Sequence, residues 1–108
     1  MKLLFVCTEN RLRSPTAEVV FAQMPGIEAL SCGTNRDAET PLTGDLVQWA
    51  DVILVMEKFH RQKVAQRFPK LLKDKRLVCL DIPDHYDYLQ PELIALLQRR
   101  VAKVLNLN

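Results

Sequence analysis

The sequence predicts an α/β fold in which a four-stranded parallel sheet, in the order 2-1-3-4, carries helices on both faces. The first observation is that short aliphatic runs recur along the chain, at 2–6, 27–32, 52–56 and 77–80. The second is that segments with helical spacing of apolar residues separate these runs, which is typical of alternating strands and helices. Strands joined by helical crossovers run parallel, and right-handed crossovers place helices on both sides of the sheet.

Each helical segment has its own signals. After the first strand an apolar face begins, and Pro25 and Gly26 end the helix. That face consists of Ala17, Val20, Phe21 and Met24. Shorter helices are expected over 43–50 and 57–67, and a last helix over 91–105. The last helix is expected to turn six apolar residues inward: Leu93, Leu96, Leu97, Val101, Val104 and Leu105. With no repeat or linker, the pattern predicts one flavodoxin-like, doubly wound domain over 1–108.

Size and composition narrow the class of protein. A chain of 108 residues is long enough to fold as one domain without disulfides. Three cysteines, an odd number, and no signal peptide favour the reducing cytoplasm. The apolar runs are too short for a spanning helix, so no membrane partner is expected. No cluster of histidine and cysteine has the spacing of a zinc site, so we expect neither metal nor cofactor.

The charge is small overall but uneven. The net charge of +2 does not argue for nucleic acid as a partner. Between Lys58 and Arg76, however, nine side chains are Lys, Arg or His, opposed by Asp74 alone. Such a run usually forms a solvated helix face. The alternative is that the basic 58–76 region binds an anionic partner or steers phosphorylated substrates.

The most informative segment is CTENRLRS, which follows the first strand and leads into the first helix. A loop that enters a helix N-terminus directs unpaired backbone N–H groups and the positive end of the helix dipole at one point, where an anion binds. The same field favours the thiolate of Cys7, a nucleophile. The predicted phosphate-binding residues are Thr8, Glu9, Asn10, Arg11, Leu12, Arg13 and Ser14.

Several residues of this segment suit that task. Arg13 offers a planar fork that can grip two phosphate oxygens, which lysine cannot. Asn10 tolerates a left-handed backbone, and Ser14 is a good helix N-cap whose hydroxyl could donate to the thiolate. Pro15 suits the first helical position. The alternative interpretation is that Cys7 is a buried small residue and Arg13 a surface charge, which leaves the rest of the segment unexplained.

At these residues the chain resembles the low-molecular-weight protein tyrosine phosphatase family. The stretch LLFVCTENRLRSPTAE is similar to that family's first strand, phosphate loop and first helix. Further landmarks are SCGT at 31–34, WADVILVM at 49–56 and IPDHY at 82–86, which resemble its second strand end, third strand and general-acid loop. The resemblance implies that Cys7 attacks phosphorus, while Arg13 and the loop amides bind the phosphoryl oxygens. It also implies that Asn10 and Ser14 hold the loop and the thiolate.

Chemistry independently requires an acid, because an alkoxide or phenolate leaves poorly unless it is protonated. The candidates past the fourth strand are Asp81, Asp84 and Asp87. We select Asp84 because Asp-His-Tyr stands where the family has Asp-Pro and an aromatic residue; the other two suit turns. Tyr86 and Tyr88 are the expected aromatic walls for a phenyl phosphate.

The chain also departs from the family pattern. Glu9 stands where the family usually has glycine, so it must point outward or pair with a basic group on the substrate. Leu12 replaces a cysteine often found in the family, and the chain is shorter between Thr34 and Trp49. Cys32 lies near the end of the strand expected beside that of Cys7, so it is either a redox partner of Cys7 or, more simply, a small buried residue.

The resulting prediction is a phosphatase that hydrolyses phosphomonoesters, in particular protein phosphotyrosine, through a cysteinyl-phosphate. Its expected partners are a phosphorylated protein or a small phosphomonoester. Arsenate reduction would require further well-placed thiols. A phosphocarrier, or a non-catalytic module that binds phosphate or RNA, would keep the loop without needing Asp84.

Overall fold

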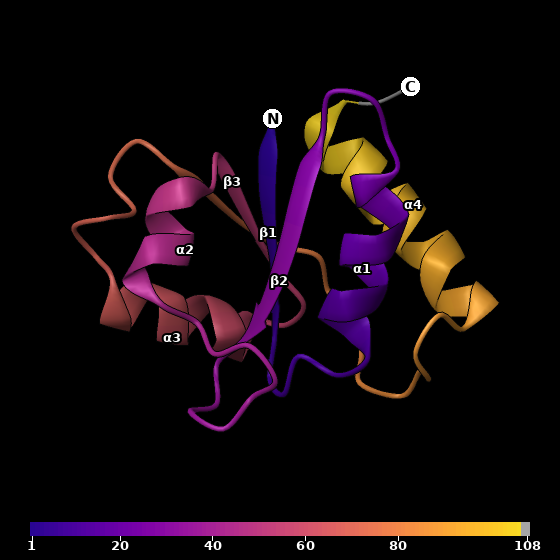
Figure 1. Cartoon of the computed structure of the whole chain (residues 1–108), viewed down its shortest axis with the longest axis horizontal. Helices are drawn as coiled ribbons and strands as arrows, with labels where there is room; N and C mark the ends of the chain where they lie inside the picture. The colour runs from indigo at the N-terminus through magenta and orange to yellow at the C-terminus, as the bar shows by residue number, and fades with distance from the viewer. Residues whose placement is uncertain (107–108) are drawn as a thin grey trace.

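The structure, a computed structural model, describes residues 1–106. Strands and helices alternate along this part of the chain (Figure 1). In order they are β1 (Lys2–Cys7), α1 (Arg13–Ala22), β2 (Glu28–Gly33), α2 (Gly44–Trp49), β3 (Val52–Val55), α3 (Lys58–Arg67), β4 (Arg76–Cys79) and α4 (Pro91–Leu105). The predicted elements are confirmed, with ends that differ by at most one residue for the strands.

The strands form one parallel sheet in the order β2-β1-β3-β4, as predicted. β1 lies inside the sheet, flanked by β2 and β3. The register pairs Cys7 with Gly33 and Val6 with Cys32. Because the strand order reverses beside β1, the loop after Cys7 emerges at the switch point of the sheet, where ligands bind in such folds.

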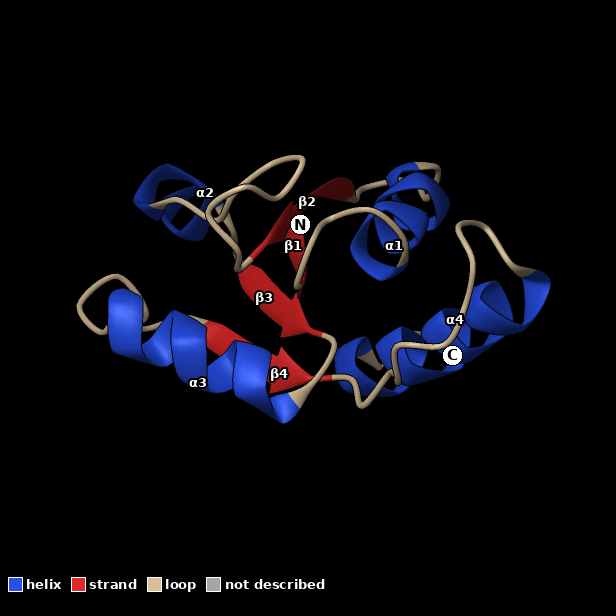
Figure 2. Cartoon of the chain, turned by 90° about the horizontal axis from the view of Figure 1, so that it is seen from below, coloured by secondary structure: helices blue, strands red, loops and turns tan. Residues whose placement is uncertain are grey.

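Successive side chains along each strand point to opposite faces of the sheet, so the hydrophobic core has one half on each face. Leu3 and Phe5 face α1 and α4, where they pack with Phe21 and Leu97. The other face packs against α2 and α3, and its buried residues include Leu4, Val6, Cys32, Val47, Ile53, Val55 and Val64. Figure 2 shows the two helix pairs on opposite sides of the strands. The buried strands thus hold the phosphate loop on a rigid base.

One local prediction was wrong: Ser14 is not the N-cap of the first helix. α1 begins at Arg13, with Leu12 at the N-cap position and no side-chain cap. The Thr16 amide donates to the Leu12 carbonyl over 3.2 Å, so Ser14 and Pro15 lie within the first turn. Ser14 is therefore free to direct its hydroxyl at the Cys7 sulfur.

Gly33, at the end of β2, lets the chain pass close to the phosphate loop. A Cβ there would lie 2.4 Å from the Thr8 carbonyl oxygen and 2.6 Å from Cβ of Ala38. The next two residues bond to the loop: the Thr34 amide donates to the Cys7 carbonyl over 2.9 Å, and the Asn35 amide to the Thr8 carbonyl over 3.1 Å. Within residues 1–106, no helix is both long and apolar enough to cross a bilayer.

Candidate active site

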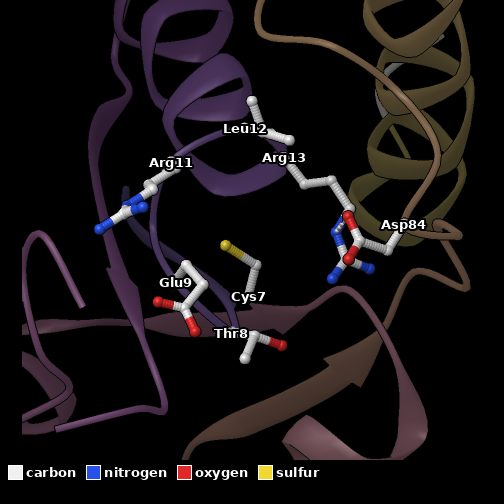
Figure 3. A pocket seen from close by; sticks show the side chains of 7 residues that line it. All are labelled: Cys7, Thr8, Glu9, Arg11, Leu12, Arg13 and Asp84. Atoms are coloured by element: carbon white, nitrogen blue, oxygen red, sulfur yellow. Dashed lines mark ion pairs between the residues drawn. The ribbon is translucent and has the colours of Figure 1, made fainter. Parts of the chain in front are cut away.

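A cavity of about 190 Å³ opens at the carboxyl end of β1. It is lined by Cys7, Thr8, Glu9, Arg11, Leu12, Arg13 and Asp84. Figure 3 shows the Cys7 sulfur directed into this space, with Glu9 and Arg11 on one side and Arg13 and Asp84 on the other. The structure therefore brings together the three residues predicted for the chemistry, from β1, from α1 and from the loop after β4.

Cys7 is almost fully buried as a residue, and two hydrogen-bonding groups contact its sulfur. Only 2% of the residue is exposed. The Asn10 amide donates to Sγ over 3.2 Å, and Ser14 Oγ lies 2.9 Å from the same atom. A thiolate at this position gains both contacts, because each can donate to a negative sulfur.

A second set of bonds fixes which way the Ser14 hydroxyl points. The side-chain amide of Asn10 donates to Ser14 Oγ over 3.0 Å and to Ser31 Oγ over 2.8 Å. Ser31 in turn donates to Glu18 over 2.8 Å. Since Ser14 accepts from Asn10, its own proton can go to the Cys7 sulfur; the competing carbonyl of Cys32 is farther, at 3.3 Å. Asn10 holds this position with a left-handed backbone, φ 58°.

The Arg13 guanidinium is buried and oriented by two other segments. Nη1 donates to Glu57 over 2.5 Å and to the Ile82 carbonyl over 2.8 Å. Nε lies 3.6 Å from the Asp84 carboxylate. Only 3% of the Arg13 side chain is exposed, yet Nη2 has no hydrogen-bond partner within residues 1–106. The guanidinium is thus held in one orientation with a donor edge left for a ligand.

The three candidate acids lie in different surroundings. Asp84 lines the cavity, and 63% of its side chain is exposed. Asp81 has a left-handed backbone (φ 54°) and accepts from the Cys79 thiol over 3.4 Å. The Asp87 amide donates to Gln90 over 2.8 Å at the start of α4. Of the three, Asp84 is the one that shares a cavity with Cys7.

The first turn of α3 contacts the phosphate loop at two points. Glu57, at the N-cap, holds Arg13. One turn later, His60 Nε2 lies 2.8 Å from Thr8 Oγ1, and its Nδ1 accepts from the Glu57 amide over 3.0 Å. Because Nδ1 is an acceptor, the ring proton is on Nε2, which donates to Thr8. One helical turn therefore positions both Thr8 and Arg13.

His60 is neutral in this arrangement. Its side chain is fully buried, and its pKa is lowered to about 4, mainly by burial and in addition by the positive charges of Arg13 and Lys63. Protonation would place a hydrogen on Nδ1 opposite the Glu57 amide and remove that bond.

Glu9, the departure from the family pattern, lines the cavity. Its carboxylate accepts from the side-chain amide of Asn35, and its backbone carbonyl accepts from the Glu39 amide over 3.1 Å. Arg11 does not neutralise it, because Arg11 pairs with Glu39 at 3.4 Å. The cavity thus carries a carboxylate at its rim.

The predicted aromatic walls lie away from this space. Tyr86 is half-buried against the core cluster that contains Leu93 and Leu97, with its ring 4.9 Å from that of His85. Tyr88 is 48% exposed. Among the described residues, neither tyrosine lines the cavity that holds Cys7.

The second and third cysteines are separated from the Cys7 sulfur. Cys32 pairs with Val6 in register, so its side chain packs on the opposite face of the sheet from Cys7. Burial raises the pKa of Cys32 to about 12, with a smaller contribution from Cys7. Burial also raises the pKa of Cys79, which lies on β4. This geometry favours the simpler interpretation of Cys32 as a packed core residue.

Three residues of the site were not predicted from the sequence: Gly33, Glu57 and His60. Their roles depend on contacts across 25 to 52 positions of sequence, such as His60 with Thr8. A partial signal existed for Glu57, which precedes a helix and shares a capping box with His60. In the described part of the chain, no three metal-ligating side chains gather.

Comparison with known proteins identifies relatives of two substrate classes. No family profile matches the sequence. A protein-arginine-phosphatase of Geobacillus stearothermophilus is 29% identical, over 68% of this chain and 66% of its own length. A probable low molecular weight protein-tyrosine-phosphatase, EpsP of Ralstonia nicotianae, is 31% identical over 62% and 63%. The chain thus spans slightly less than two thirds of the length of these relatives.

Solved structures extend the likeness to nearly the whole fold. The YwlE arginine phosphatase from Geobacillus stearothermophilus superposes with a TM-score of 0.72 and 26% identity, covering 97% of this chain and 92% of that one. A C7S mutant of YwlE arginine phosphatase with a phosphorylated active-site serine has a TM-score of 0.71 and 26% identity, covering 100% and 97%. Sequence landmarks, strand order and loop geometry agree with these comparisons. The chain is thus similar in sequence to a probable low molecular weight protein-tyrosine-phosphatase and shares its fold with the YwlE arginine phosphatase.

Proposed function

We propose that this protein is a cysteine-dependent phosphatase that removes phosphoryl groups from protein side chains, with phosphotyrosine as the first candidate substrate. The observation that carries the proposal is that Cys7, Arg13 and Asp84 line one cavity at the switch point of the sheet. These residues supply a nucleophile, a phosphate-binding cation and an acid.

In the first half-reaction, the Cys7 thiolate attacks phosphorus. The S–P bond forms as the bond from phosphorus to the tyrosine oxygen breaks, and Asp84 gives its proton to that leaving oxygen. The fixed guanidinium of Arg13 stabilises the charge on the phosphoryl oxygens, and its bonds to Glu57 and Ile82 avoid reorganisation during the step.

In the second half-reaction, water attacks the cysteinyl-phosphate. Asp84, now a carboxylate, takes a proton from the water as the P–O bond forms and the S–P bond breaks. Ser14 stabilises the departing thiolate, since its hydroxyl lies 2.9 Å from Sγ. The products are inorganic phosphate and the starting enzyme.

The alternative functions leave some residues of the site without a role or need residues that the site does not bring together. A phosphocarrier or a phosphate-binding module has no need of a carboxylic acid beside the nucleophile, whereas Asp84 lies 3.6 Å from Arg13 at the cavity. Arsenate reduction needs a thiol relay, and Cys32 packs on the far face of the sheet. A cytoplasmic location suits an enzyme whose nucleophile must remain a free thiol.

The test is steady-state hydrolysis of para-nitrophenyl phosphate and a phosphotyrosine peptide, with and without chelator. We expect Cys7→Ser to abolish turnover and Asp84→Asn to lower kcat by about 10²-fold or more. Asp81→Asn and Asp87→Asn are the matched controls and should keep kcat within about threefold, because both residues lie outside the cavity. A parent protein that binds vanadate without turnover would contradict the proposal.

Phosphoarginine is a second candidate substrate, and Glu9 is the observation that favours it. A phosphorylated arginine carries its guanidinium directly on phosphorus, so a carboxylate at the cavity rim can pair with the leaving group. The same carboxylate offers nothing to a neutral phenol and repels the dianion. Two structures of YwlE arginine phosphatase are among the similar structures.

Glu9→Gln separates these substrates. If phosphoarginine is the substrate, the variant should lose roughly tenfold in kcat/KM on a phosphoarginine peptide while holding or gaining activity on the phosphotyrosine peptide. Equal changes on both peptides would remove phosphoarginine from consideration.

A further inference from the structure

A second cleft, of about 410 Å³, lies beside the phosphate loop. It is lined by Thr34, Arg36, Lys63, Gln66 and Arg67. Three of these side chains are cationic and none is acidic. Arg36 belongs to the loop after β2, and the other two cations belong to α3, so the positive charge comes from two segments that are distant in sequence.

This cleft shares structural elements with the active site. Thr34 continues β2 alongside Cys7, to whose carbonyl its amide donates over 2.9 Å. Lys63 lies one helical turn beyond His60, which contacts Thr8. The end of β2 and the first turns of α3 therefore contribute to both sites.

The structure also sorts the basic 58–76 region into two groups. Lys75 donates to the carbonyls of Gln48 and Ala50, and Arg76 donates to that of Val104. Lys75 and Arg76 therefore stabilise the fold through bonds to backbone carbonyls. By contrast, Lys63 of this region forms no ion pair with any carboxylate within residues 1–106, and neither does Arg36 of the loop after β2.

Two residues of the cleft have defined hydrogen-bonding roles: Arg67 is held in place by backbone carbonyls, and Thr34 has a hydroxyl with no acceptor within residues 1–106. Arg67 spans the loop after β2, with bonds of 3.5 Å to the Thr34 carbonyl and 3.2 Å to that of Leu42. Thr34 is 7% exposed, and its hydroxyl is buried without a hydrogen-bond partner in the described part of the chain. A buried hydroxyl left unpaired is costly, and an anionic ligand would supply the missing acceptor.

We propose that this cleft binds an anionic group of the protein substrate, a carboxylate or a second phosphate, close in sequence to the residue being dephosphorylated. The proposal rests on the proposed function, since the active site fixes the substrate's position. An extended peptide advances about 3.3 Å per residue, so the anionic group must stand at a defined spacing from the phosphorylated residue.

The test compares phosphopeptides that carry one glutamate or one phosphoserine, moved from four residues before the phosphorylated residue to four residues after it. Alanine-only peptides and para-nitrophenyl phosphate are the references. We expect kcat/KM to rise roughly three- to tenfold at one spacing, as for one or two partly exposed ion pairs. Glutamate and phosphoserine distinguish the two sources of the charge.

The variant R36A/K63A should remove this preference and leave turnover of para-nitrophenyl phosphate unchanged. The matched control, K70A/K73A, removes two exposed charges outside the cleft and should keep the preference. A peptide series with no preferred spacing, or equal losses in both double variants, would overturn the proposal.

Two further measurements separate this proposal from the phosphatase proposal and from nucleic-acid binding. Binding of the same peptides to the Cys7→Ser protein reports on the cleft even if the parent protein proves inactive, so failure of the phosphatase proposal is read separately. If R36A/K63A keeps the peptide preference but loses affinity for an RNA homopolymer, the cleft is a nucleic-acid site and the proposal is wrong.

Discussion

At the scale of single residues, the site depends on side chains whose hydrogen bonds allow one arrangement. Asn10 donates to Ser14, which leaves the Ser14 proton for the Cys7 sulfur. His60 accepts from the Glu57 amide, which leaves its ring proton for Thr8. These constraints orient the groups before a ligand arrives, which is the condition for electrostatic stabilisation of a transition state.

Arg13→Lys tests the fork geometry at constant charge. Lysine cannot bond to Glu57, to the Ile82 carbonyl and to two phosphoryl oxygens at once. We expect kcat/KM on para-nitrophenyl phosphate to fall by about 10²- to 10³-fold, with an unfolding temperature close to that of the parent. Activity within threefold of the parent would show that charge alone suffices.

His60 predicts a pH dependence of stability. The folded protein holds its pKa near 4, below the ordinary 6.5, so between these values the unfolded chain binds more protons. Stability contributed by neutral His60 is therefore complete above about pH 6.5 and is lost as the pH falls towards 4. The limit of this effect is about 3 kcal/mol.

Urea unfolding between pH 4 and 7 measures this effect. In the variant His60→Gln, which has no titrating ring, the decline in free energy of unfolding over this window should be smaller by about 1 kcal/mol or more. Parallel curves for the parent and the variant would contradict the assignment of His60 as a buried neutral residue.

At the scale of elements, the site depends on two contacts between elements. The end of β2 packs against the phosphate loop, and the first turn of α3 contacts Thr8 and Arg13. Local patterns predicted the strands, the helices and the anion-binding segment because periodicity and turn residues are local signals. The N-cap assigned to Ser14 was wrong because the helix starts two residues earlier, with its first bond to Leu12. The roles of Gly33 and His60 depend on tertiary contacts that no local pattern encodes.

Gly33→Ala tests the first approach. The new methyl group meets the Thr8 carbonyl at 2.4 Å, a backbone atom that cannot move without shifting the loop. We expect a loss of about 1–3 kcal/mol in the free energy of unfolding and weaker vanadate binding. Gly44→Ala is the matched control, because its nearest contact is the flexible Leu71 side chain at 3.4 Å. Equal effects of the two substitutions would contradict this role for Gly33.

Because successive side chains of a strand point to opposite faces of the sheet, the structure predicts whether Cys7 and Cys32 can form a disulfide. Cys7 and Cys32 belong to neighbouring strands, but their side chains pack on opposite faces of the sheet. We expect peroxide to oxidise Cys7 without forming a Cys7–Cys32 linked peptide, as measured by mass spectrometry of the digested protein. Recovery of that linked peptide from folded protein would contradict the observed register.

At the scale of the whole molecule, a single doubly wound sheet brings Cys7 and Arg13, which belong to adjacent elements, together with Asp84 from the distant loop after β4. The strand order predicted from the sequence already placed the phosphate loop at the switch point. The structure adds the contacts of Glu57 and His60 with that loop and the neighbouring cationic cleft. Thr34 connects the two sites, because it lines that cleft and its amide donates to the Cys7 carbonyl.

The most direct test of the central claim is to trap the covalent intermediate. The protein is mixed with para-nitrophenyl phosphate, quenched in acid within milliseconds and digested, and the peptide that contains Cys7 is analysed by mass spectrometry. We predict one phosphoryl group on Cys7, and its absence in Cys7→Ala protein treated in the same way. Turnover of the substrate with no phosphoryl group on Cys7 at any time would contradict the mechanism.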